Sequence, residues 1–96
     1  MYVLNISYSQ PLSKVEPHMV KHSEWVRQHL ERGTFLAAGP KKSGLGGIIL
    51  GKSMPKPELQ ALLAGDAFVT ADVADYQISE FDCRLTAADL HSLSGL

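Results

Sequence analysis

Large hydrophobic side chains alternate with smaller or polar ones at the start of the chain. From Tyr2 to Tyr8 every even position holds a tyrosine, leucine or isoleucine, and the odd positions hold Val3, Asn5 and Ser7. A period of two is typical of a β-strand that buries one face, because successive strand side chains point to opposite sides. The pattern therefore predicts a strand over residues 2–8.

A helical period replaces this alternation after Pro11. Apolar residues recur there at intervals of four or seven: Val15, Met19, Val26 and Leu30. Such spacing places side chains on one face of a helix. It predicts a helix up to about Arg32, where Gly33 can adopt the left-handed conformation that ends helices. His22 fills the one step of this stripe at which another apolar residue is expected.

Shorter strand and helix patterns fill the rest of the chain. Strands are predicted at 34–39, 47–51 and 76–81, and helical segments at 58–64 and 67–74. Pro40 is expected to stop the first of these strands, which should pair with the next as a hairpin. Pro55 and Pro57 suit the first turn of the second helix, and Gly65 is expected to close it.

The order strand-helix-strand-strand-helix-strand predicts an α+β protein with the ferredoxin-like βαββαβ arrangement. In this arrangement both helices cover one face of an antiparallel sheet. Ile48, Ile49 and Leu50 are consecutive and apolar, so at least one of them faces away from the helices. We therefore expect a homodimer that buries the uncovered sheet face of each copy.

A single domain is expected over residues 1–84, followed by a tail over 85–96. Thr86 with Asp89 three residues later resembles a weak helix start, so the tail is expected to hold a short helix. Residues 92–96 read as a frayed terminus.

Composition narrows the partners and the compartment. The 96 residues carry a formal net charge of -1, and their basic residues are scattered, which leaves no basic stripe for nucleic acid. No apolar stretch approaches the length of a membrane span, and no secretory signal is visible before the first strand. The single Cys83 has no disulfide partner. We expect a cytoplasmic protein with no nucleic-acid or membrane partner.

His22 and Asp66 are the candidates for chemistry. An imidazole titrates near neutral pH, and a carboxylate bonded to one ring nitrogen fixes its tautomer, which leaves the other nitrogen free to take or give a proton. The pair would then act in general acid-base catalysis. The structural alternative is a satisfied core histidine beside an aspartate that binds backbone N–H groups at a turn.

Metal and nucleotide sites are weaker interpretations. His18 and His22 are one helical turn apart, and Asp66 could add a third ligand, but two histidines at that spacing are common by chance. Solvated His18 and His29 side chains are the simpler interpretation, so no metal is expected. The glycines at 44, 46 and 47 precede a strand, whereas a phosphate loop opens onto a helix.

Three segments of the chain resemble the YciI-like (YCII-related) family. They are the run from His22 to Pro40, with its Gly-x-x-x-Ala-x-Gly-Pro ending, the Gly46–Leu50 segment, and Asp66-Ala67-Phe68-Val69. The resemblance extends from Tyr2 to about Phe81. It implies a ferredoxin-like domain that forms a dimeric α+β barrel, with a His–Asp pair as the active site, here His22 and Asp66. The family usually has proline directly after this aspartate, and Ala67 in its place is expected to loosen the loop.

With this resemblance, the sequence favours a cofactor-free enzyme of the lyase or isomerase type. His22, oriented by Asp66, would move a proton on a small hydroxylated aromatic or carbonyl substrate. The side of the pocket that binds substrate is expected to include Tyr8, Gly39, Pro40 and Phe68. A non-catalytic small-molecule binding module and a protein-interaction module of the same fold remain open as alternatives.

Overall fold

The computed structural model describes all 96 residues. Its elements are β1 (Tyr2–Tyr8), α1 (Leu12–Val15), the 3-10 helix η1 (Glu16–His18), α2 (Met19–Glu31), β2 (Phe35–Pro40), β3 (Gly46–Gly51), α3 (Lys56–Leu63), α4 (Ala67–Thr70), β4 (Ala74–Glu80) and the 3-10 helix η2 (Ala88–Leu93).

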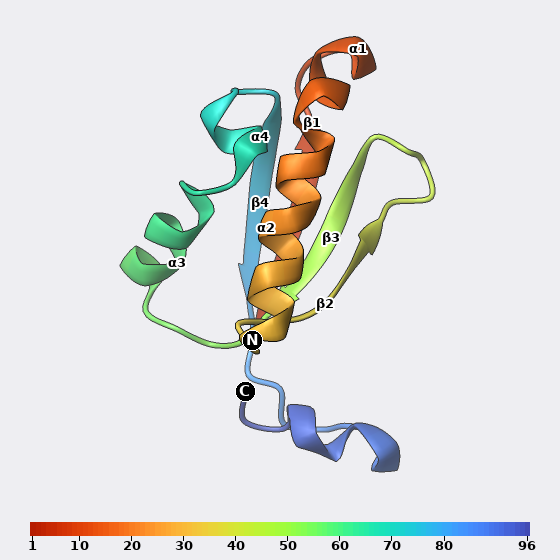
Figure 1. Ribbon diagram of the computed structural model, residues 1–96. Helices are drawn as coiled ribbons and strands as arrows, with labels where there is room; N and C mark the ends of the chain where they lie inside the picture. Colours follow the sequence, from red (N-terminus) through yellow and green to blue (C-terminus); the bar gives the residue numbers. More distant parts are fainter.

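The four strands form one antiparallel sheet in the order β2-β3-β1-β4. The helices α2, α3 and α4 all lie on the same side of this sheet (Figure 1). This arrangement confirms the predicted ferredoxin-like α+β fold.

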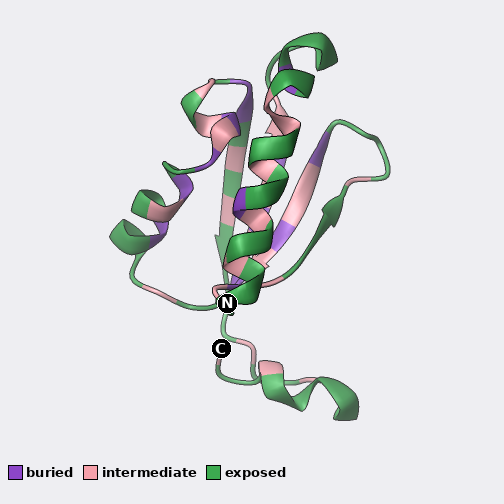
Figure 2. Ribbon diagram, in the orientation of Figure 1, coloured by how far each residue is buried: buried purple, intermediate pink, exposed green.

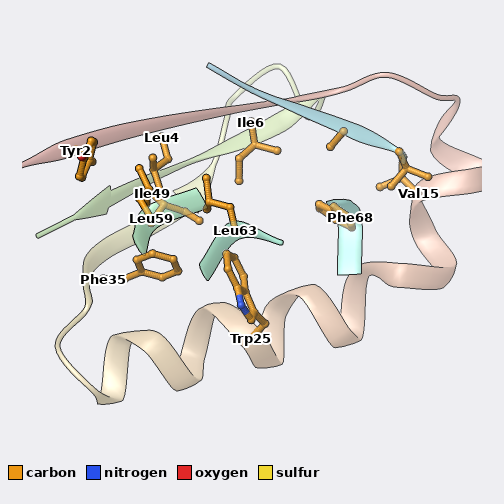
Figure 3. Close-up of a cluster of buried hydrophobic side chains, with 12 residues drawn as sticks. Tyr2, Leu4, Ile6, Val15, Trp25, Phe35, Ile49, Leu59, Leu63 and Phe68 are labelled. Carbon is orange, nitrogen blue, oxygen red and sulfur yellow. The ribbon is translucent and has the colours of Figure 1, made fainter. Parts of the chain in front are cut away.

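The core lies between β1 and the helices. Its twelve buried side chains come from every strand, from all four α-helices and from the connection before β4: Tyr2, Leu4, Ile6, Val15, Trp25, Phe35, Ile49, Leu59, Leu63, Phe68, Val73 and Ala74. The alternation of β1 sets this arrangement, because Tyr2, Leu4 and Ile6 all point towards the helices. Trp25 is the buried residue of α2 and points from that helix towards the strands (Figure 3).

The predicted helix stripe is only partly covered. Val26 is half-buried and Leu30 is exposed. The sheet opposite them carries small side chains, since strand pairing places Ala38 beside Ile49 and Pro40 beside Gly47 on the helix-facing side. A space therefore remains between α2 and this half of the sheet.

Gly46 fixes the hairpin between β2 and β3. Its φ of 148° lies in a region that favours glycine, and a Cβ atom there would overlap the carbonyl oxygen of Ile6. β1 and β3 approach each other closely at this point, so no larger residue fits.

The first predicted helix is not continuous. Pro17 has no N–H to give to the preceding turn, and the chain passes through η1 before α2 begins at Met19. β2 ends at Pro40 as expected, although Pro40 is itself the last strand residue and pairs with Gly47. A proline is tolerated there because β2 is an edge strand.

Gly65 does not close α3 in the predicted way. It follows the helix without a positive φ, and its Cβ would lie 3.5 Å from Nε1 of Trp25. The carbonyl oxygen of Leu62 would lie nearer still, at 3.3 Å, so an added Cβ would be crowded by the helix end more than by the tryptophan ring. The expectation that Gly33 ends the first long helix is confirmed. Gly33 adopts a φ of 76° directly after the last residues of α2, Glu31 and Arg32.

The tail extends away from the sheet and holds η2. No residue from 82 to 96 is buried (Figure 2), and the side chain of Leu85 is 93 % exposed. Thr86 does not cap the helix as its position suggested, because the N-cap is Ala87 and no side chain bonds there. No helix of the structure has the length and apolar character needed to span a bilayer.

The sheet face opposite the helices carries apolar side chains. Ile49 is buried under the helices, and the alternation of β3 places Ile48 and Leu50 on the other face, with Val3 of β1 beside Leu50. The expectation that part of the Ile48–Leu50 run faces away from the helices is confirmed.

Candidate active site

Asp66 is a fully buried carboxylate that accepts three hydrogen bonds. Its Oδ1 atom accepts from Nδ1 of His22 at 2.6 Å and from the backbone N–H of Phe68 at 3.0 Å. Its Oδ2 atom accepts from the hydroxyl of Tyr76 at 2.6 Å. The exposed fraction of Asp66 is 0 %, so every bond to this group comes from the protein. Three donors from three elements suit an ionised carboxylate, which only accepts.

The position of Asp66 follows from local structure. It is the N-cap of α4, and the bond from the Phe68 N–H is the usual cap interaction. This bond, together with those from His22 and Tyr76, holds the carboxylate firmly. Ala67 is the first residue of α4.

His22 lies on α2, and its ring is held on two sides. Nδ1 bonds to Asp66, and the imidazole stacks on the Phe68 ring with a centroid distance of 3.9 Å and an interplanar angle of 7°. Because the carboxylate accepts at Nδ1, the proton of a neutral imidazole lies on that nitrogen. Nε2 then presents a free lone pair, which is the arrangement that a general base requires.

Tyr76 was missed by sequence reasoning, which treated it as a strand residue. Strand pairing sets it beside Ile6 on the helix-facing side of β4, where its hydroxyl reaches Asp66. Burial and the bond to Asp66 raise the pKa of Tyr76 far above its ordinary value. A polar group at an inward-facing strand position was the signal that could have found it.

A cavity of about 590 Å³ opens between α2 and the β2–β3 half of the sheet. It is lined by His22 and by Tyr8, Gly39, Pro40 and Phe68, so the structure brings together the residues expected to bind substrate. The Tyr8 ring packs edge-on against the Phe68 ring, with 5.7 Å between the ring centroids. The Tyr8 hydroxyl donates to no protein group. Asp66 lies behind His22, outside the lining.

Ser23 and Arg27 of α2 also line the cavity, and neither was singled out from the sequence. Both belong to the polar positions between the apolar steps of the helix. Their only signal was their spacing of one helical turn from each other, which is shared by many solvent-facing residues.

His29 differs from the solvated side chain that was expected. Its ring packs against Trp25 and Phe35, and its Nδ1 atom is buried without a hydrogen-bond partner. Burial, and then the charge of Arg32, lower the pKa of His29. As for metal, no group of three or more His, Cys, Asp or Glu side chains is placed to hold an ion.

Comparison with known proteins relates this geometry to others. No curated protein sequence matches the chain. A solved structure with the same fold is 5-chloro-2-hydroxyhydroquinone dehydrochlorinase from Burkholderia phenoliruptrix in complex with 2,5-dihydroxybenzoquinone. The two chains are 14 % identical, with a TM-score of 0.67 over 84 % of this chain and 93 % of the other.

The match to a family model is more specific than the similarity in fold to a solved structure. The family model of the YCII-related domain matches residues 1–82, which leaves only the tail outside it. The matched region contains the whole sheet, both long helices and every residue that lines the cavity. The chain therefore belongs to the YCII-related domain family.

Proposed function

We propose that the protein is an enzyme that moves a proton on a small hydroxylated aromatic or carbonyl compound, with His22 as the base and Asp66 as its orienting partner. The observation that carries this proposal is the 2.6 Å bond from Nδ1 of His22 to a fully buried Asp66, which leaves Nε2 of a cavity-lining ring free. Asp66 would stabilise the imidazolium that forms when Nε2 accepts a proton.

The reaction type follows from what the removed proton leaves behind. When Nε2 takes a proton from an acidic carbon or hydroxyl, the electron pair stays on the substrate. It either expels a leaving group, as in a lyase, or is protonated at another position, as in an isomerase. The fold is also that of a dehydrochlorinase solved with a dihydroxybenzoquinone, which supports a hydroxylated ring as the substrate class.

The walls of the cavity suit such a compound. Phe68 and Tyr8 offer aromatic surface, the free Tyr8 hydroxyl can bond to a substrate oxygen, and Gly39 and Pro40 leave room along β2. These four residues form the proposed binding side of the pocket, and the proposed reaction needs no cofactor.

We also propose a homodimer through the uncovered sheet face, which would complete a dimeric α+β barrel. Val3, Ile48 and Leu50 are the apolar side chains that a second copy would cover. The free Cys83 suits a reducing compartment, and we place the protein in the cytoplasm.

The test of the proposed reaction uses solvent exchange, because the natural substrate is unidentified. Wild type is incubated in D₂O with a panel of hydroxyquinols and cyclic diketones, including 5-chloro-2-hydroxyhydroquinone, from about pH 5 to about pH 9. Deuterium incorporation or chloride release reports proton removal. We expect His22→Ala to abolish it and Asp66→Asn to lower it by roughly 10²–10⁴-fold.

The matched control is His18→Ala, which removes a histidine one turn earlier that makes no bond to Asp66. It should keep wild-type activity. Thermal melts of all three variants separate chemistry from packing. Ligand binding without turnover in wild type would identify a binding module, and destabilised His22 and Asp66 variants with unchanged ligand response would leave only a structural role.

A further inference from the structure

Arg27 is the one permanently charged side chain in the lining of the cavity. No aspartate or glutamate lines it, because the Asp66 carboxylate lies behind His22. The only permanent charge in the lining is therefore positive, and no lining carboxylate balances it.

The guanidinium of Arg27 makes no ion pair, although its helix offers two carboxylates. Glu24 lies three residues before it and Glu31 four residues after it, both at spacings that allow a helical ion pair. The ion pairs of the chain are His22 with Asp66 and Arg84 with Asp82, and neither glutamate approaches Arg27 within 4.0 Å. Its five N–H donors stay available to a ligand.

The position of Arg27 relative to the proposed base is fixed by the helix. Arg27 lies five positions after His22 on α2, which corresponds to about 7.5 Å along the helix axis. Ser23 lies one turn before Arg27 and also faces the cavity. His22, Ser23 and Arg27 all line the same cavity, so a ring compound bound there with its reacting carbon at Nε2 of His22 shares the cavity with this guanidinium.

We propose that Arg27 is the specificity-determining residue of the cavity, and that the ligand is a ring compound with one negatively charged oxygen, a carboxylate or an ionised hydroxyl group. Arginine suits this role because its planar fork can bond an oxygen anion with two donors. This inference deepens the proposed function and rests on it for the role of His22.

The test measures binding of two matched pairs of probes and no turnover. Benzoate is compared with benzamide, and 4-nitrophenolate with 4-nitroanisole, by calorimetric titration at about pH 8.5, where an ordinary imidazole is neutral. Wild type should bind at least one anion about tenfold tighter than its neutral partner. Arg27→Gln should reduce that ratio to about one and keep the affinity for the neutral probe within about twofold.

Arg32→Gln is the matched control, because it removes the same charge from the end of the same helix, outside the cavity. It should keep the preference for anions. A preference in only one probe pair supports the proposal and identifies the oxygen group.

The proposal is overturned if wild type shows no preference in either pair, including no binding. It is also overturned if Arg27→Gln keeps the preference, or if Arg32→Gln loses it equally. If solvent exchange depends on His22 but the protein shows no preference for anions, only the role of Arg27 is contradicted. If the protein prefers anions but catalyses no exchange, only the proposed reaction is contradicted.

Discussion

Asp66 is the residue that joins the parts of the site. A buried carboxylate is tolerated only when its lone pairs are satisfied, and here α2, α4 and β4 each supply one donor. Loss of the Tyr76 hydroxyl leaves Oδ2 without a partner, and loss of His22 leaves Oδ1 with only the Phe68 N–H. Each deletion should therefore have a cost in stability that is separate from its effect on chemistry.

Tyr76→Phe tests this at a single hydroxyl. We expect the free energy of unfolding near pH 7 to fall by about 1–3 kcal/mol, because Oδ2 of Asp66 loses its partner. The pKa of Tyr76 is raised in the folded protein by burial and by its bond to Asp66, whereas an unfolded tyrosine ionises near pH 10. The stabilisation is then fully present below about pH 10 and is lost as the pH rises above it.

Urea unfolding of wild type and Tyr76→Phe from about pH 7 to about pH 11 checks this prediction. The difference between the two proteins should stay constant to about pH 9 and shrink above about pH 10. Tyr8→Phe is the control, since the Tyr8 hydroxyl has no protein partner and its loss should change stability little. Equal stability of Tyr76→Phe and wild type at neutral pH would contradict the importance of the third donor.

The β2–β3 hairpin is the element that shapes the cavity. Small side chains on its helix-facing side leave the space under α2, and Gly46 sets its turn against β1. Gly46→Ala should therefore lower the free energy of unfolding by about 1–3 kcal/mol or prevent folding, because the new methyl group would meet the Ile6 carbonyl.

Gly39→Ala is the matched control on the same hairpin. Its φ is not positive and nothing lies within 4 Å of the added atom, so its effect on stability should be small. Thermal melts of the two variants make the comparison. A Gly46→Ala protein as stable as the Gly39→Ala protein would contradict the close approach of β1 and β3.

The spacing of apolar residues and the positions of glycine and proline in the sequence were enough to predict most of these helices and strands. The alternation of β1 and the apolar run of β3 predict strands, and Gly33 ends α2 as expected. The break at Pro17 was missed because the stripe around it keeps its helical spacing. Tyr76 and Arg27 could not be placed, since their roles depend on partners that only the folded chain brings near.

At the scale of the whole molecule, the uncovered sheet face is the surface of the proposed dimer. A Leu50→Glu substitution would place a charge in the middle of the proposed interface, beside Val3. We expect wild type to be a dimer burying at least about 1,200 Å² and the variant to be a monomer, because an unpaired charge in an apolar interface is costly.

Sedimentation velocity at micromolar concentration checks this expectation. Val20→Glu is the matched control, because Val20 is 69 % exposed on α2 and the same charge there should leave the dimer intact. Circular dichroism confirms that each variant is folded. A monomeric wild type would rule out the proposed dimer.

The bond between His22 and Asp66 also has a consequence for folding. It closes a loop of 44 residues that includes β2, β3 and α3, so the two side chains can meet only after the hairpin and both long helices have packed. Contacts of such sequence separation form late, because the entropy of closing the chain must be overcome first. A partly folded chain with helices and a hairpin but without this bond would lack the proposed base, so activity during refolding should appear only after the two segments that carry His22 and Asp66 have met.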